Sequence, residues 1–307
     1  MYAFLVRRLL STIPVLFGVL LLVFSMLHLV PGDPVKMMLG EFQTSPEQIA
    51  KLQSQLHLDE PLPQQFGRYV WDALHGDLGT SIRSNKPVTQ EIMDNLPATL
   101  QLALAGLLIA GVLGISLGVL AAIKQYSWVD AGSMLIALIG VSMPSFWLGL
   151  LFIFALSLKV HLFPATGGGD LRHLVLPAVT LGLGASAIIA RLTRSSMLEV
   201  MRHEYVTTAR AKGIRESRVI IRHALKNALI PVVTIFGLQF GQLLAGTVVI
   251  ETVFGRPGIG RLIVDAILNK DFPLVQGIVL VVAISYVVVN LIVDLLYAFL
   301  DPRIRYD

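Results

Sequence analysis

The chain has 307 residues, of which 55% are hydrophobic and only 14% are charged, and its mean hydropathy is +0.73. An ordinary soluble domain carries roughly 25% charged residues, and a water-soluble fold of this length could not hide so much apolar side chain. The composition excludes a cytosolic enzyme, a disordered tail and a secreted disulfide scaffold. Because cysteine is absent, disulfides and thiolate metal sites are excluded as well. A membrane protein with several spans remains.

Long stretches without charge predict the transmembrane helices, each near the ~20 apolar residues that one crossing needs. In chain order they are Leu9–Val30, Leu96–Ile123, Ala131–Leu158, Leu174–Ala190, Asn227–Ile250 and Leu274–Val293. The first stretch is too long for the apolar part of a signal peptide, so we expect a retained span. Pro144 predicts a kink in the third stretch. The predicted fold class is an all-α membrane protein with six transmembrane helices.

The lysines and arginines predict the orientation of these spans. Of the 24 basic residues, fourteen lie at the two termini or in the second-to-third and fourth-to-fifth connections, and five lie in the short loops opposite. The other five lie in the long first loop, where basic residues count little. Since cytoplasmic segments carry the basic excess, both termini are predicted to be cytoplasmic (N-in/C-in). Topology then explains the pI of about 9.4, and no nucleic-acid partner is expected.

The predicted organisation has a first span over residues 1–30, an external helical cap over 31–97, a five-span core over 98–300 and a cytoplasmic tail over 301–307. Within the cap, Ser45-Pro46-Glu47 predicts the start of one short helix, and Phe66 to Leu74 predicts a second that stops at Gly76. A third helix is expected to run from Pro87 into the next span. The cap either covers the membrane surface alone or also docks an extracellular partner.

A basic connection over residues 191–226 is predicted to be helical and cytoplasmic. Its segment from Glu204 to Gly213 has small residues in the middle and ends on a glycine suited to a helix C-terminus. From the residues alone, this connection can serve as a topology signal, as a surface for anionic lipid headgroups, or as a docking site for a protein.

Polar residues within the spans mark a candidate pathway. Gln239, Gln242 and Gly246 follow a spacing of i, i+3 and i+7, which predicts one shared helix face. An amide that faces lipid is costly, so this face is expected to look toward protein or water. The two glutamines either bridge helices or line a polar path. Ser142 and Ser145 flank Pro144 in the third span and are assigned to the same candidate pathway.

The chain offers no catalytic or metal-binding motif. It lacks G-x-x-x-x-G-K-[ST] and H-E-x-x-H, and its seven histidines show no metal-ligand spacing. Acids within the spans are almost absent, which argues against a proton-coupled carrier. A pathway protein without its own energy source is expected to work with partners.

Short motifs along essentially the whole chain carry a resemblance to a known family. They are Pro31-Gly32-Asp33-Pro34, Leu58–Leu62, Gly76–Ser81, Ala190–Met197, Tyr205–Gly213, Arg222–Pro231, Pro257–Arg261 and Asp301–Arg305. In this order and spacing the sequence resembles the inner-membrane permease subunits of dipeptide/oligopeptide/nickel-type ABC importers, specifically the subunit with the larger first external loop. The resemblance implies the type I ABC importer permease fold in the plasma or inner membrane of a bacterium or archaeon.

The resemblance also implies a coupling helix that contacts the ATPases. It assigns that role to Thr207, Thr208, Ala209, Arg210, Lys212 and Gly213. Where the wider superfamily has Glu-Ala-Ala, this chain has Thr207-Thr208-Ala209. The implied partners are a second homologous permease, two ATPases that bind ATP and Mg, and a periplasmic or lipid-anchored binding protein, besides membrane lipid. Peptides are the first expected cargo. Glutathione, nickel chelates and opines are alternatives within the family, and a self-contained channel or secondary carrier is an alternative from another class.

Overall fold

The computed structural model describes residues 2–29, 34–39, 47, 50, 53–54 and 57–300. Apart from one isolated bridge between Thr80 and Pro87, this part of the chain contains helices and turns but no β-strand. The all-α prediction is confirmed. The chain divides into two compact units, one formed by Met1–Pro97 and Arg261–Leu291, the other by Ala98–Gly260 and Ile292–Asp307.

The helices that are long and apolar enough to cross a membrane coincide with the predicted stretches. Among the described residues, five helices meet this test alone, and one bent helix pair brings the number to as many as six. The five lie in α1 (Tyr2–Leu29), α5 (Val88–Ile123), α8 (Arg172–Val200), α11 (Lys226–Val253) and α13 (Phe272–Leu300). The bent pair consists of α6 (Trp128–Ser142) and α7 (Ser145–Phe152), the latter extended by the π-helical segment η1 (Ile153–Lys159).

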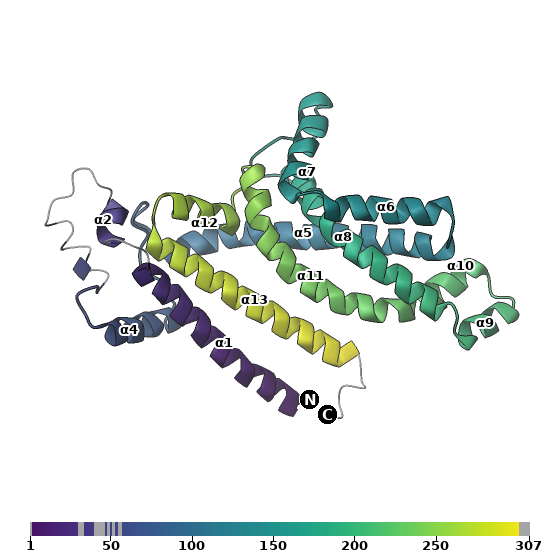
Figure 1. Ribbon diagram of the computed structural model, residues 1–307, viewed down its shortest axis with the longest axis horizontal. Coiled ribbons are helices and arrows are strands. Elements are labelled where there is room, and N and C mark those ends of the chain that lie inside the picture. The colour runs from purple at the N-terminus through teal and green to yellow at the C-terminus, as the bar shows by residue number, and fades with distance from the viewer. Residues whose placement is uncertain are drawn as a thin grey trace. The chain divides into compact units, whose positions relative to one another are not determined.

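The break between α6 and α7 lies at the predicted kink. The two helices are bent by 107°, and Figure 1 shows α7 turning sharply away from the line of α6. Met143 and Pro144 have extended backbone, with ψ of 135° and 132°. Proline lacks an N–H group and disfavours the helical conformation of the residue before it. The kink at Pro144 is therefore confirmed, as a complete helix break.

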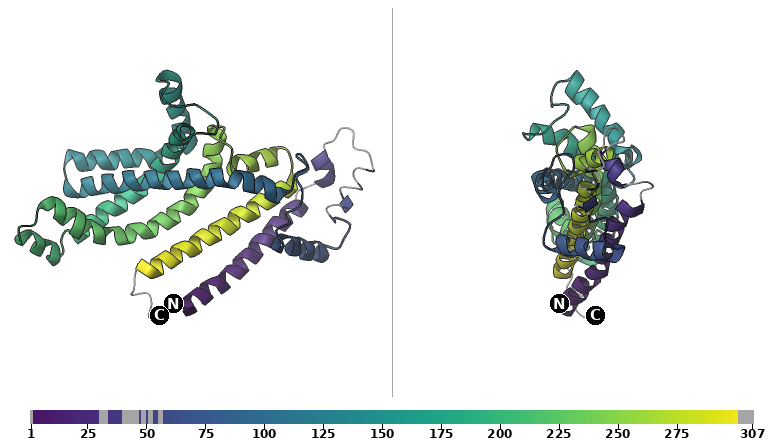
Figure 2. Two further views of the ribbon diagram at one scale, coloured as in Figure 1. Left: turned by 180° about the vertical axis from the view of Figure 1, so that it is seen from behind. Right: turned by 90° about the vertical axis from the view of Figure 1, so that its left-hand side faces the viewer.

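The first unit is organised around α1. Phe66 of α4 (Leu62–Leu74) packs edge-on against Phe17 and Phe24 of α1, and the Gln276 side chain of α13 donates a hydrogen bond to the Val23 carbonyl. Figure 2 shows α1 and α13 side by side.

The described parts of the cap follow two of the three predicted helices. The second predicted helix is present as α4, which ends before Gly76 with its φ of +81°, and α5 begins at Val88 as expected. The segment Ser45-Pro46, the motif Pro31-Gly32-Asp33 and residues 301–307 lie outside the described residues. Two short helices, α2 (Pro34–Leu39) and α12 (Ile259–Leu268), were not predicted.

The second unit is a bundle in which α8 is the most enclosed helix. Sixty-seven per cent of the most apolar stretch of α8 is buried, and α6, α7 and α11 all pack against this helix. The core includes Leu181 and Ile189 of α8 with Leu102 of α5. A Cβ atom added at Gly114 of α5 would lie 2.7 Å from Ile189 Cβ, so only glycine allows this close approach.

The connection between α8 and α11 is helical, as predicted. It contains α9 (Glu204–Ala211), the single turn α10 (Glu216–Arg218) and the π-helical segment η2 (Val219–Leu225), which continues into α11. The helix α8 itself extends to Val200, ten residues past the predicted end of the fourth span at Ala190.

Candidate functional site

The short helix α9 ends in a fully formed C-terminal cap. The Gly213 N–H donates to the Arg210 carbonyl at 2.9 Å, and the Ile214 N–H donates to the Ala209 carbonyl at 3.3 Å. This pair of bonds is the Schellman arrangement, which needs a residue with positive φ at the C′ position. Gly213 supplies it with a φ of +71°. The glycine singled out from the sequence thus fixes where α9 stops.

One face of α9 is buried against the rest of the second unit. Val206 is fully buried and Ala209 is 6% exposed. Together with Ile214, they pack in a cluster formed with the end of α8, the end of α5 and η2. Its other members include Ala122, Met197, Val200, Val219, Ile220 and Ala224. We call this cluster the α9 seam. It holds a short helix that could not be stable alone.

The outer face of α9 carries most of the residues that were assigned to ATPase coupling. These exposed residues are Thr207, Thr208, Arg210, Lys212 and Gly213. Ala209, the sixth assigned residue, lies in the α9 seam because it is three positions from Val206 and shares its side of the helix. The structure therefore brings five of the six together on one surface and turns Ala209 inward.

Polar contacts orient α9 on this support. The Asn227 side chain donates to Tyr205 Oη at 2.7 Å, which links α9 to the start of α11. Arg210 donates to both carboxylate oxygens of Glu216, at 2.7 and 3.2 Å. These hydrogen bonds raise the pKa of Arg210, so the guanidinium stays charged.

The polar residues assigned to the pathway do not all share one exposed face. Gln242 is exposed, whereas Gln239 is 5% exposed and Gly246 is half-buried near Leu181. Ser142 and Ser145 are both exposed, on either side of the break between α6 and α7. Gln242, Ser142 and Ser145 can thus meet water or a partner, while Gln239 faces the interior of the unit.

A buried polar cluster at the end of α11 was not predicted. Glu251 is fully buried and accepts hydrogen bonds from the Thr99 hydroxyl at 2.6 Å and from the Gly260 N–H at 2.7 Å. The Thr99 oxygen in turn accepts the Ile259 N–H at 2.8 Å. A carboxylate at the first N–H groups of α12 is the favoured partner of a helix N-terminus. The cluster fixes the turn from α11 into α12.

Arg256 completes this cluster. It is 4% exposed and donates from Nη2 to the Gln101 side-chain oxygen at 2.9 Å. Burial lowers the pKa of Arg256, and the charge of Glu251 opposes this shift. In the sequence, this cluster is marked only by an acid, Glu251, directly after the predicted end of the fifth span at Ile250. That acid alone does not identify the side chains and N–H groups that bind it.

A partly buried ion pair joins α6 to α8. Arg194 donates from Nε and Nη2 to the two carboxylate oxygens of Asp130, both at 2.7 Å. Asp130 also accepts the Tyr126 N–H at 3.1 Å. The bidentate geometry fixes the beginning of α6 beside the second half of α8. No group of three or more His, Cys, Asp or Glu within the described part of the chain could hold a metal ion.

The fold of the chain has counterparts among solved structures of ABC transporters. The fold is similar to that of a chain in an inward-facing structure of the MetNI methionine ABC transporter, with a TM-score of 0.59 and 18% identity. That match covers 68% of this chain and 96% of the other. A chain of an amino acid ABC transporter with histidines matches at a TM-score of 0.53 and 13% identity, over 68% of this chain and 94% of that one. Over about two thirds of the chain, the fold is thus that of the importer permeases that the resemblance implied.

The chain belongs to the family of binding-protein-dependent transport system inner membrane components. The model of that family matches residues 114–306, and the model of its N-terminal region matches residues 1–103. The resemblance identified from the sequence motifs is therefore confirmed.

Relatives in bacteria match this chain over its full length. A dipeptide transport system permease protein DppB of Alkalihalophilus pseudofirmus is 46% identical, covering 100% of both chains. The DppB of Escherichia coli is 44% identical, over 100% of this chain and 99% of the relative. A glutathione transport system permease protein GsiC of Escherichia coli is 42% identical over 100% of both.

Proposed function

We propose that the chain is the transmembrane permease subunit of an ATP-dependent peptide importer and forms half of its translocation pathway. A second homologous permease would supply the other half, and two ATPases would bind ATP and Mg, for which this chain has no site of its own. A periplasmic or lipid-anchored binding protein would deliver the cargo to the cap over residues 31–97. In this proposal the chain lies in the bacterial inner membrane with both termini and α9 in the cytoplasm.

The exposed face of α9 is the observation that carries this proposal. Thr207, Thr208, Arg210 and Lys212 are exposed to another subunit, while Val206 and Ala209 anchor the helix from behind. A surface helix held by a buried seam can receive a displacement from the ATPases without detaching. The α9 seam joins that helix directly to α8 and η2.

The pathway would open alternately to the two sides of the membrane. ATP-driven closure of the ATPases would shift the population between an inward-open and an outward-open state. ATP and the loaded binding protein can cause this shift only if each binds one of the two states better than the other. Gln242, Ser142 and Ser145 are exposed polar groups that would line the cavity. Gln239 and Gly246 would support this lining from the interior.

Peptides are the first proposed cargo, since two relatives at 46% and 44% identity bear the name of dipeptide permeases. Glutathione, itself a tripeptide, is the second candidate. The alignment with the glutathione permease has 306 positions, close to the 307 residues of this chain. The alignment with the first dipeptide permease has 334 positions and therefore requires gaps in this chain. Nickel chelates and opines are the remaining family alternatives.

Reconstitution tests the proposal. The permease is purified with its ATPases and second permease, placed in proteoliposomes, and supplied with the binding protein loaded with labelled dipeptide or glutathione. We expect accumulation that requires ATP and all subunits, and vesicles that hold this chain alone should accumulate nothing. Accumulation by the chain alone would identify a channel or secondary carrier and overturn the proposal. Competition by unlabelled dipeptide, glutathione, a nickel chelate or an opine identifies the cargo.

A further inference from the structure

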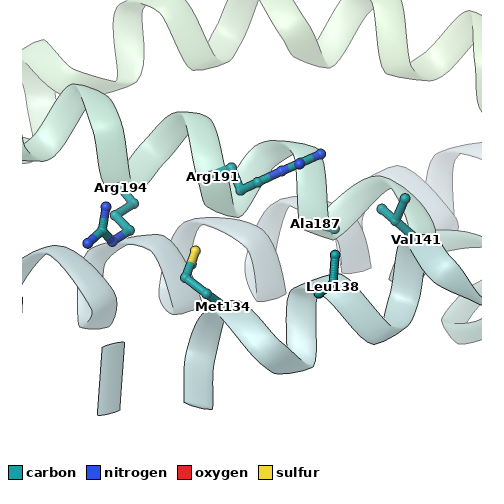
Figure 3. A pocket seen from close by; sticks show the side chains of 6 residues that line it. All are labelled: Met134, Leu138, Val141, Ala187, Arg191 and Arg194. Carbon is teal, nitrogen blue, oxygen red and sulfur yellow. The ribbon is translucent and has the colours of Figure 1, made fainter. Parts of the chain in front are cut away.

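A groove between α6 and α8 adjoins the Asp130–Arg194 ion pair. Its volume is about 360 Å³. Figure 3 shows its lining, which consists of Met134, Leu138 and Val141 from α6 and Ala187, Arg191 and Arg194 from α8. The walls are apolar, and the two arginines supply its only charged side chains.

The two arginines differ in whether a nearby carboxylate neutralises their charge. Arg194 is neutralised by its bidentate pair with Asp130. Arg191 is exposed, and within the described part of the chain it has no ion pair or hydrogen-bond partner. In Figure 3 its side chain extends away from Arg194. One unneutralised cation therefore stands beside an apolar wall, which is the arrangement that an anion with an apolar body would fill.

The surface of α6 beside the groove has the character of a lipid-facing helix. Leu135, Ile136 and Ile139 are all more than 40% exposed. At the beginning of this helix, Tyr126 and Trp128 are 89% and 94% exposed. Exposed aromatic side chains of this kind mark the boundary between hydrocarbon and headgroups.

Arg191 lies somewhat deeper than the aromatic side chains that mark the headgroup boundary. Arg194 meets Asp130, which lies two residues after Trp128, and Arg191 lies about one turn nearer the N-terminus of α8. With a rise of about 1.5 Å per residue, Arg191 is roughly 5–10 Å deeper than the aromatic level. The Arg191 side chain points away from Arg194 in Figure 3, so it would turn toward the aromatic level to meet a phosphate in the headgroup region.

We propose that this groove binds an acidic phospholipid, with its phosphate on Arg191 and an acyl chain along Met134, Leu138 and Val141. A peptide fits the groove less well, because its ammonium group needs a carboxylate and Asp130 is already engaged by Arg194. The apolar walls would also leave the N–H and C=O groups of a peptide without partners. Basic pockets between transmembrane helices are known to suit anionic headgroups in general.

Native mass spectrometry of the full-length chain, purified with whatever subunits accompany it, tests this site. The probe is phosphatidylglycerol, with zwitterionic phosphatidylcholine as the reference lipid. Wild type should retain one phosphatidylglycerol in preference to phosphatidylcholine. Arg191→Gln should weaken that retention roughly tenfold or more, because it removes a charged hydrogen bond. Arg202→Gln is the matched control, since it removes another exposed arginine that lies outside the groove.

A second pair of variants addresses the acyl chain and does not alter charge. Leu138→Trp should fill the groove and displace the lipid, whereas Leu135→Trp, one turn away and also exposed, should leave retention unchanged. The proposal is overturned if Arg191→Gln and Leu138→Trp retain the lipid as wild type does. It is also overturned if Arg202→Gln loses as much lipid as Arg191→Gln, or if a dipeptide displaces the lipid, which would assign the groove to the cargo instead.

Discussion

Thr99 donates a hydrogen bond to Glu251 across 2.6 Å, although 152 residues separate them in the chain. The two side chains are 5% and 0% exposed, and the same carboxylate accepts the Gly260 N–H. One buried acid thus joins α5, the end of α11 and the start of α12. The Thr99 hydroxyl and the Gly260 N–H both depend on this carboxylate for a partner, because they are buried away from water.

Glu251→Gln should therefore destabilise the protein. Both Thr99 and Gly260 donate to the carboxylate, but an amide has a single acceptor oxygen, so one donor would face an NH₂ group. A buried donor without a partner costs about 1–3 kcal/mol. Thermal unfolding in detergent should show an apparent Tm lower by several degrees. Glu199→Gln, an exposed glutamate of α8, should stay near wild type, and equal Tm values for both variants would contradict the assignment.

Ala209→Leu should uncouple ATP hydrolysis from uptake. The larger side chain would overfill the α9 seam, at a cost of about 1–3 kcal/mol, and push α9 from its support. In proteoliposomes with the complete importer, we expect ATPase activity that no longer responds to loaded binding protein, and uptake that falls with it. Ala131→Leu places the same residue at an exposed position of α6 and should change neither rate. Normal transport by Ala209→Leu would show that α9 does not transmit the displacement.

Asp130 and Arg194 should show strong energetic coupling in a double-mutant cycle. Asp130→Asn, Arg194→Gln and the double variant, compared by thermal unfolding, should give a coupling of roughly 0.5–3 kcal/mol. The pair is favoured by its geometry and burial, since the Asp130 side chain is 9% exposed and that of Arg194 is 26% exposed. Arg210 and Glu216, whose side chains are 38% and 55% exposed, form the control cycle and should couple weakly. Equal coupling in both cycles would argue against a structural role of the Asp130–Arg194 pair.

Thiol labelling can test the pathway directly, because the chain contains no cysteine. Gln242→Cys should react with a membrane-impermeant maleimide, since a thiolate forms where water reaches the side chain. Leu243→Cys, at a neighbouring position that is 4% exposed, should not react. Labelling of Gln242→Cys should also slow when cargo occupies the cavity. An unreactive Gln242→Cys would indicate that this residue faces lipid or another subunit.

The helices were predictable because hydropathy and backbone chemistry are local properties. Pro144 marked the break in the third span, since its ring disturbs the residues immediately beside it. Gly213 marked the end of α9, because the C-terminal cap needs a positive φ at one position. Each of these features depends on a few consecutive residues.

The faces of the helices were harder to predict, because they depend on which neighbours pack against them. At 100° per residue, Gln239 and Gly246 differ by only about 20° around α11, whereas Gln242 lies about 60° away from Gln239. The edge of the buried surface passes between the two glutamines, so only Gln242 is exposed. The partners of Glu251 lie on other elements, and a sequence read along one helix contains no signal for them.

The short link between α8 and α9 has a mechanical consequence. Only residues 201–203 separate the two helices, and the N–H of each donates to a carbonyl in the last turn of α8. Packed interiors have low compressibility, so neither this link nor the side chains behind α9 can absorb a small displacement elastically. A displacement of α9 would therefore pass to α8 through this short hydrogen-bonded link and through the α9 seam, without a flexible hinge between them.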